Sequence, residues 1–353
     1  LETRGTAVPV LDDVAYSQVV GAGQFAVSRT GAFIYRRLGD DAAAMRTLQW
    51  VSPDGATGKK EPLRATPGAY GTPRLAPDGT RIALVITAGR NSDVWVYDLQ
   101  RDAITRLTFS GANHYPVWSP DGQYLVFERV GEGIFQARAD GASQPQVLTE
   151  SKNSQTPWSF TADGKRLAYH EFVAGTDTAQ IWTAPLEDQG GQLKAGTPEL
   201  FLKSTFKDLF PSLSPDGRWL AYASDESGKL EVYVRAFPPP SSGQGGKWQV
   251  SNNGGDDPHW SRTGHELVYQ SGNQLLTASY SVNGNTFVAE KPRVWITTLG
   301  SAADRQSWDL AADGKRVAVV IPEGSAQALQ AEHVIVMLQN FADELRRRVP
   351  LGK

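Results

Sequence analysis

The chain has 353 residues, with 35 Gly, 21 Pro and 10 Trp, and 40% of its residues are hydrophobic. This composition is typical of a turn-rich, folded β protein and argues against a disordered chain. The formal net charge of −3 leaves no excess of Lys and Arg for a nucleic-acid backbone. The absence of cysteine excludes disulfides and thiolate chemistry. The longest apolar runs are far below the roughly 18 residues of a membrane helix, so no membrane segment is predicted in this chain.

The chain opens on Leu1 with neither a starting Met nor a signal peptide, so we expect a piece of a longer protein. Residues 7–11, Ala-Val-Pro-Val-Leu, predict a short strand. One motif then recurs: an apolar residue, a small residue, two linking residues and a glycine, often as Ser-Pro-Asp-Gly. The anchor glycines that end this motif are Gly31, Gly79, Gly122, Gly164, Gly217, Gly264 and Gly314. Their spacings of 42 to 53 residues are typical of propeller blades.

The positions that flank the anchor glycines are apolar. Four places before each glycine stand Val27, Leu75, Trp118, Phe160, Leu213, Trp260 and Leu310. Three places after each glycine stand Ile34, Ile82, Leu125, Leu167, Leu220, Leu267 and Val317. Apolar residues on both sides of a tight turn predict a hairpin with one buried face. Pro, Asp and Gly suit the successive positions of that turn.

Further apolar runs follow the hairpins. Third strands are predicted at 94–97, 133–135, 180–182 and 231–234, and fourth strands at 106–108, 147–149 and 248–250. Four antiparallel strands make one blade, and blades must stack around an axis to bury their faces. The sequence therefore predicts an all-β, seven-bladed β-propeller of four-stranded antiparallel blades. Six or eight blades remain alternatives, because the turns at Gly31 and Gly264 lack Asp.

The two ends of the chain are predicted to meet in the last blade. The last repeat has strands at 317–320 and 334–338 but no fourth strand, and residues 7–11 would complete it and remove an exposed edge. Asn340 can cap a short C-terminal helix that ends in three arginines at 346–348. The predicted domains are a single propeller over residues 1–340 and a helical tail over 341–353.

The recurring Trp-Ser-Pro-Asp-Gly hairpins resemble the TolB-like, WD-repeat-like propeller family over nearly the whole chain. Residues 333–341 and the following Glu344-Leu345 and arginines, together with the entry strand at 8–11, also look like propellers fused behind bacterial serine/threonine kinases. That resemblance implies a propeller outside the cytoplasmic membrane, preceded by a kinase domain and a membrane helix that this chain does not contain.

Known catalytic patterns are missing from the sequence. No Gly-x-Ser-x-Gly elbow occurs, and the five histidines show no metal-ligand spacing. The Asp-Gly pairs lack the calcium-loop spacing and are read as turns. We therefore predict no catalytic residues, no metal and no cofactor, and no enzyme in this chain.

A binding site is predicted where the innermost strands of the blades meet the central channel. The positions seven to nine places before the anchor glycines are rich in polar and aromatic side chains. Arg74 and His259, five places before their glycines, are polar where the flanking positions are apolar. The candidate ligand-binding residues are Tyr70, Arg74, Asn113, His114, Tyr115, Gln155, Asp208, Asp256, Asp257, His259 and Arg305. Converging polar and aromatic groups suit a peptide, a protein or a small polar ligand. The alternative is that these groups bond to one another and to channel water.

Three functions fit these patterns. The first is a non-catalytic extracytoplasmic sensor of a receptor serine/threonine kinase, and the second is a TolB-type scaffold that docks a protein. The third is a lyase or hydrolase that uses the channel carboxylates Asp208, Asp256 and Asp257. The sequence favours the first and predicts no particular oligomeric state.

Overall fold

The computed structural model describes residues 14, 16–17, 22–23, 25–28, 32–36, 45–53, 59–63, 66–88, 91–240, 245–297, 299, 306–322, 335–341, 343 and 347. These residues group into two compact units, one of residues 46–321 and the other of residues 1–45 with 322–353. No helix of the described residues is long and apolar enough to cross a bilayer. The single domain predicted over residues 1–340 stays a prediction.

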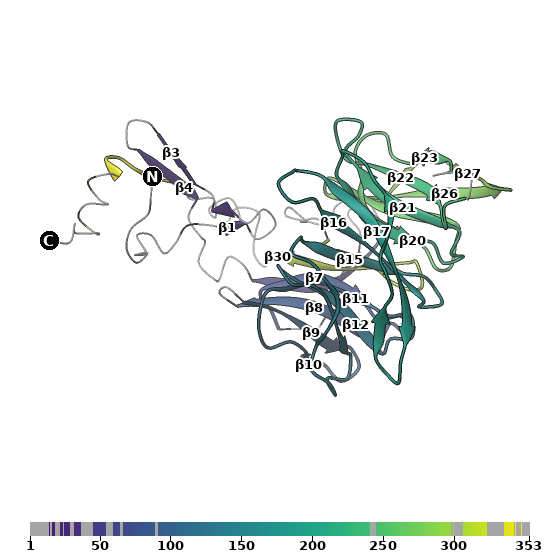
Figure 1. Cartoon of the computed structure of the whole chain (residues 1–353), viewed down its shortest axis with the longest axis horizontal. Coiled ribbons are helices and arrows are strands. Elements are labelled where there is room, and N and C mark those ends of the chain that lie inside the picture. Colours follow the sequence, from purple (N-terminus) through teal and green to yellow (C-terminus); the bar gives the residue numbers. More distant parts are fainter. Residues whose placement is uncertain are drawn as a thin grey trace. The chain divides into compact units, whose positions relative to one another are not determined.

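The larger unit is a β-propeller whose described residues form six antiparallel sheets (Figure 1). The first two sheets contain β7 (Tyr70–Leu75), β8 (Arg81–Ala88), β9 (Asn91–Asp98) and β10 (Ala103–Arg106), then β11 (Asn113–Trp118), β12 (Tyr124–Arg129), β13 (Gly133–Arg138) and β14 (Gln146–Glu150). The third and fourth contain β15 (Gln155–Phe160), β16 (Arg166–Phe172), β17 (Ala179–Asp188), β18 (Leu193–Ala195) and β19 (Glu199–Leu202), then β20 (Asp208–Leu213), β21 (Trp219–Ser224), β22 (Glu231–Ala236) and β23 (Lys247–Gln249). The fifth contains β24 (Asp256–Trp260), β25 (Glu266–Ser271), β26 (Gln274–Asn283), β27 (Thr286–Ala289) and β28 (Arg293–Ile296).

The sixth sheet joins the two ends of the larger unit. It has the order β29 (Trp308–Leu310), β30 (Val317–Pro322), β5 (Arg46–Ser52) and β6 (Lys59–Pro62). Strands β5 and β6, which precede the other blades in the chain, therefore complete the last blade. Residues 7–11, predicted to complete it, lie outside the described residues. The described residues of this unit thus form six blades, the number predicted as an alternative to seven.

The smaller unit contains the remaining strands. In it β1 (Tyr16–Ser17) pairs with β2 (Ala22–Gly23), and β4 (Phe33–Arg36) lies between β3 (Phe25–Val27) and β31 (Ile335–Leu338). The strand at 335–338, predicted for the last blade, thus belongs to a different sheet. In the predicted tail, Phe341, Asp343 and Arg347 are helical, and the ring of Phe341 stacks on Phe33 with centroids 4.4 Å apart.

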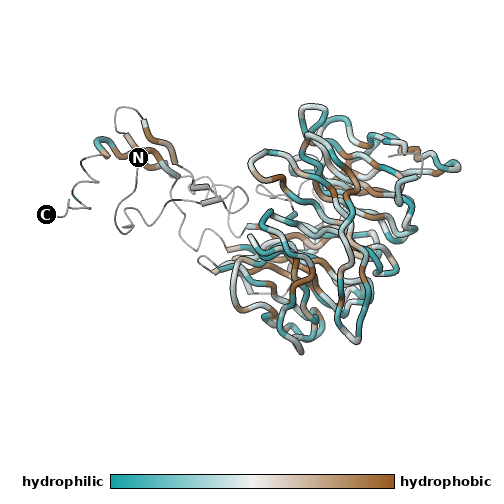
Figure 2. Tube along the Cα trace, in the orientation of Figure 1, coloured by the Kyte–Doolittle hydropathy of each residue, from teal (hydrophilic) through white to brown (hydrophobic). Residues whose placement is uncertain are grey.

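The residues that flank the six anchor glycines of the propeller differ in burial from the two residues that flank Gly31. Of their twelve flanking residues, ten are buried and the other two, Phe160 and Leu310, are half-buried. The two residues that flank Gly31 are instead exposed, Val27 by 59% and Ile34 by 39%. The prediction that they are core residues is wrong, because their hairpin pairs with β31 and forms no blade. Along the propeller, hydrophobic residues follow the strands (Figure 2).

The anchor turns are built as the Ser-Pro-Asp-Gly pattern predicts. The backbone N–H of Gln123 donates to the Asp121 carboxylate at 3.0 Å, and the Ser119 hydroxyl donates to the same oxygen at 2.5 Å. Gly122 has a φ of +68°, a conformation that favours glycine. Asp121 therefore acts as a turn residue, in line with the sequence interpretation. At Gly264, where Asp is absent, the glycine does not adopt a positive φ.

Candidate binding site at the channel mouth

The innermost strand of each blade contributes one side chain to a single ring. Five places before the anchor glycines of the propeller stand Arg74, Val117, Ser159, Ser212, His259 and Asp309. All of them line one cavity of about 400 Å³, which we name the mouth cavity. Residues that lie up to 235 positions apart in the sequence thus meet at the end of the channel where the anchor turns lie.

The ring is charged on one side only. His259, Asp309 and Arg74 come from three consecutive blades, whereas the other three blades contribute Val117 and two serines. Apolar residues complete the wall of the mouth cavity, namely Trp118, Trp158, Phe160, Trp260, Pro77, Pro120 and Pro215. The exposed Arg262 takes, in its repeat, the position that proline has in three others.

His259 lies between two carboxylates. Its Nε2 is 2.9 Å from Oδ1 of Asp257, and its Nδ1 is 3.3 Å from Oδ1 of Asp309. Burial alone would lower the pKa of His259, but the two carboxylates outweigh burial and raise this pKa to about 9. His259 is therefore protonated at neutral pH and acts as a hydrogen-bond donor, not as a general base.

Asp309 connects the last blade to the first. Its Oδ2 accepts the backbone N–H of Leu75 at 2.6 Å. Burial alone would raise the pKa of Asp309, but His259, Arg74 and the N–H of Leu75 together hold it below its usual value. The ring closure thus contains a buried ion network that extends from Asp257 to Arg74.

Arg74 reaches across the channel. Its Nη1 donates to the carbonyl oxygens of Pro73 at 3.0 Å and Trp308 at 3.2 Å, and the centre of the guanidinium lies 4.7 Å from the ring of Trp158. Arg74 is only 6% exposed, yet it lines the mouth cavity. The guanidinium therefore has a fixed position, because both its face and one of its nitrogens are held.

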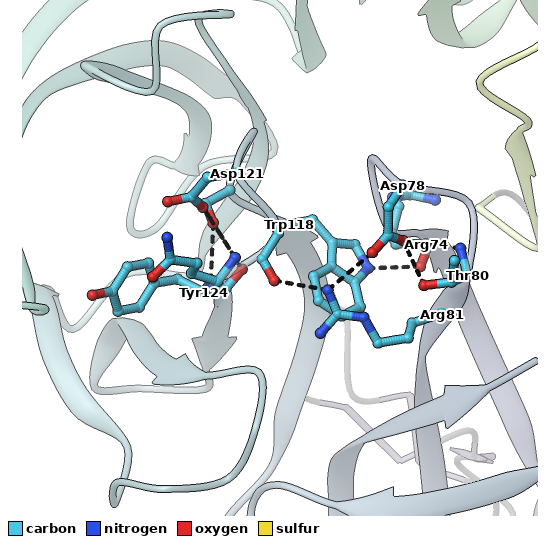
Figure 3. A network of polar contacts seen from close by, with 10 residues as sticks. Arg74, Asp78, Thr80, Arg81, Trp118, Asp121 and Tyr124 are labelled. Atoms are coloured by element: carbon cyan, nitrogen blue, oxygen red, sulfur yellow. Dashed lines mark hydrogen bonds and ion pairs between the residues drawn. The ribbon is translucent and has the colours of Figure 1, made fainter. Parts of the chain in front are cut away.

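Hydrogen bonds and cation–π contacts tie neighbouring blades together around the mouth cavity. Nε1 of Trp118 donates to the carbonyl of Arg74 at 2.9 Å, and Arg81 lies over the indole of Trp118 while it bonds the carbonyl of Gly122 at 3.0 Å (Figure 3). Nε1 of Trp260 makes the equivalent bond to the carbonyl of Ser212 at 2.9 Å. These tryptophans therefore hold neighbouring blades together.

Comparison with known proteins supports this architecture. Residues 50–190 match the family model described as the TolB beta propeller domain. A solved structure from Agrobacterium tumefaciens described as TolB superposes with a TM-score of 0.56 at 16% identity, covering 80% of this chain and 99% of that chain. This chain folds as a TolB-like β-propeller.

Curated relatives resemble this TolB-like propeller over about half of its length. The Tol-Pal system protein TolB of Francisella tularensis is 29% identical over 175 residues, which are 48% of this chain and 38% of that protein. An uncharacterized protein of Agrobacterium fabrum is 24% identical over 208 residues, covering 49% of this chain and 67% of that protein. The match with TolB thus spans well under half of that relative.

Most of the other predicted site residues of the TolB-like propeller lie at the starts of its inner strands, away from the anchor turns, and several have internal partners. The buried Asn113 donates to the carbonyls of Ser110 and Ser92. Gln155 accepts the Thr149 hydroxyl at 2.7 Å. Similar bonds link the Tyr70 hydroxyl to the carbonyl of Thr66, and Ser204 to the Asp208 carboxylate. For these four residues the geometry fits the alternative in which the polar groups bond to one another.

The remaining predicted residues divide by position. His114 and Tyr115 are half-buried neighbours, and burial lowers the pKa of His114 to about 4. Asp256 is half-buried on β24, and Asp257 supports His259. Arg305 lies outside the described residues. Of the predicted residues that the structure describes, Arg74 and His259 alone line the mouth cavity, with Asp257 behind them.

Two features of the TolB-like propeller were missed by sequence reasoning. Asp309 occupies the same repeat position as Arg74 and His259, so reading that position across all repeats would have found it. The inner strands are also bulged, with a positive φ at Thr72, Tyr115, Phe210 and Asp257. Such bulges redirect side chains toward one end of a strand. The residue types at these positions do not predict a bulge.

The TolB-like propeller should lose stability as the pH rises from 7 to 9. The folded-state pKa of His259 is raised from 6.5 to about 9, so its contribution is complete below pH 6.5 and is lost as the pH rises through 9. We expect urea denaturation to show a loss on the order of 2 kcal/mol over this range. His259→Gln should start less stable and vary little between pH 7 and 9, and an unchanged slope in this variant would contradict the assignment.

Proposed function

We propose that this chain is a TolB-type docking propeller that binds a protein partner at the mouth cavity and carries no catalytic activity. The observation that best supports this function is the mouth cavity, in which the fixed side chain of Arg74 lies next to apolar walls at one open end of the channel. Peptide segments are recognised by concave, mostly apolar sites with a few well-placed polar groups. The name of the Francisella relative, a Tol-Pal system protein, supports docking within an envelope assembly and thus an extracytoplasmic location.

The chemistry of the site favours docking over catalysis. The carboxylates of Asp257 and Asp309 are engaged with His259, and Asp208 accepts a hydrogen bond from Ser204. Among the described residues, no group of three or more His, Asp or Glu side chains could hold a metal ion. A lyase or hydrolase that uses Asp208, Asp256 and Asp257 would need free carboxylates that face one another.

The kinase-sensor reading is retained as a second hypothesis. It depends on the resemblance of residues 333–348, of which the structure describes 335–341, 343 and 347. It differs from the docking scaffold in its ligand, because a sensor of small molecules requires no stable protein adduct at the mouth cavity.

Photo-crosslinking from the rim of the mouth cavity tests the docking function. A photoreactive amino acid at position 262 should give one discrete protein adduct in cells of the native host. The same group at Arg101, whose side chain is 84% exposed in the β9–β10 turn, should give none and serves as the control. Equal adducts from both positions, or none from position 262, would reject docking at this site.

A further inference from the structure

The mouth cavity has a charge pattern that limits what it can bind. Its charged lining residues are Arg74, His259, Arg262 and Asp309. Asp309 is already committed to His259 and to the N–H of Leu75, and Asp257 is committed to the other side of His259. No acidic side chain of the described residues pairs with Arg262, which is exposed at the rim. The unmatched charge in the cavity is therefore positive.

Arg74 is placed to recognise a planar anion. Its two hydrogen bonds both use Nη1, and the face of the guanidinium lies over Trp158. Nη2 and Nε remain on the edge of the guanidinium, and a stacked arginine presents this edge to carboxylates with two parallel hydrogen bonds. Because stacking and the Nη1 bonds fix the side chain in advance, little entropy is lost when a ligand binds.

The walls next to Arg74 are apolar. Trp118, Trp260 and the prolines at 77, 120 and 215 line the same cavity of about 400 Å³. This volume suits one or two amino-acid side chains and not a folded domain. An anion that enters the cavity would therefore be accompanied by apolar groups, as in a short stretch of extended polypeptide.

From this geometry we infer that the mouth cavity binds a carboxylate of an extended peptide, held by Arg74, with a neighbouring apolar side chain against the Trp and Pro walls. Arg262 at the rim adds positive potential that draws the segment in. The inference rests on the proposed docking function and names the chemistry of the docked segment. The carboxylate has two possible sources, a C-terminal residue or the side chain of Asp or Glu.

Peptide titrations followed by the tryptophan indole N–H signals test this inference. The probes are Ac-Ala-Pro-Ala-Leu with a free C-terminal carboxylate, the same peptide as its amide, and Ac-Ala-Pro-Glu-Leu-amide. We expect at least one acidic peptide at millimolar concentration to shift the signals of Trp118, Trp158 or Trp260, and the neutral amide to bind about tenfold more weakly. The acidic peptide that binds more tightly identifies the source of the carboxylate.

Variants separate a specific site from general charge attraction. Arg262→Glu should weaken the acidic peptide about tenfold, because it reverses the charge at the rim. Arg101→Glu makes the same change of charge on an outer turn and should leave the affinity unchanged. Arg74→Lys keeps the charge but removes the planar edge, and it should also weaken binding in a protein whose spectrum shows it to be folded.

Several results would overturn the inference. They are equal binding of the acidic and amide peptides, no shift with either acidic peptide, and equal effects of the two charge reversals. A crosslinked partner at position 262 together with equal binding of acid and amide would keep the docking function and reject the carboxylate. Peptide binding without any crosslinked protein would keep the carboxylate site and reject the docking of a protein.

Discussion

Asp309→Ala is expected to lower the free energy of unfolding by about 3–5 kcal/mol, because removing one partner of a buried ion network leaves the other charges uncompensated. The variant loses the bond to the N–H of Leu75 at 2.6 Å and the contact with Nδ1 of His259 at 3.3 Å. Both contacts join the blade of β29 to a neighbouring blade, so the ring closure itself is weakened. Urea denaturation followed by tryptophan fluorescence measures the loss.

Asp313→Ala is the matched control for this prediction. Asp313 lies in the anchor turn of the same repeat, is exposed, and accepts the N–H of Lys315 at 2.9 Å. Its replacement should cost about 1 kcal/mol, the contribution of an ordinary hydrogen bond. Equal losses in the two variants would show that the network does not hold the ring closed.

Gly133→Ala should be the second strongly destabilising change, with a loss of more than about 3 kcal/mol. A Cβ at this position would lie 2.1 Å from the backbone oxygen of Thr149, and Gly133 has a φ of +122°. Strand β14 would have to move away from β13, because the obstructing atom belongs to the backbone.

Gly131→Ala separates steric conflict from backbone strain. Gly131 also has a positive φ of +76°, but a Cβ there meets nothing within 4 Å. Its replacement should cost about 1 kcal/mol, the usual difference between Gly and Ala in such a conformation. Thermal and urea unfolding of both variants give the comparison, and a Gly133 variant as stable as the Gly131 variant would contradict the close packing of β13 on β14.

The blades were predictable from the sequence because their signals are local. The turn at Asp121-Gly122 and the apolar residues at Trp118 and Leu125 lie within eight residues of one another, and the structure confirms both the turn and the burial. How the ring closes was not predictable in the same way. Residues 335–338 form an apolar run, whereas residues 46–52 mix polar with apolar residues, and these sequences do not show which of the two segments pairs with β30.

The hairpin at Gly31 shows that a short sequence motif does not determine where a hairpin packs. Val27 and Ile34 repeat the pattern of the other hairpins, yet they are exposed in a sheet with β31. A hairpin motif specifies a turn and two strands, but the neighbours of the hairpin are chosen by contacts distant in sequence.

The candidate site was predictable only in part for a related reason. Arg74 and His259 stood out because they are polar between apolar neighbours, and the structure brings both to the mouth cavity. Asn113 and Gln155 stood out equally, but internal hydrogen bonds occupy them. The sequence shows that a side chain is polar, whereas only the fold shows whether a partner satisfies it.

The ring closure and the mouth cavity both depend on the contact between His259 and Asp309, which lie fifty residues apart in the sequence and in neighbouring blades. An NMR titration of the His259 ring, identified by its loss in His259→Gln, tests this contact most directly. We predict a pKa near 9 in the wild-type protein and a clear fall toward 6.5 in Asp309→Asn. A wild-type pKa near 6.5 that does not change in Asp309→Asn would contradict the ring closure and the mouth cavity built on it.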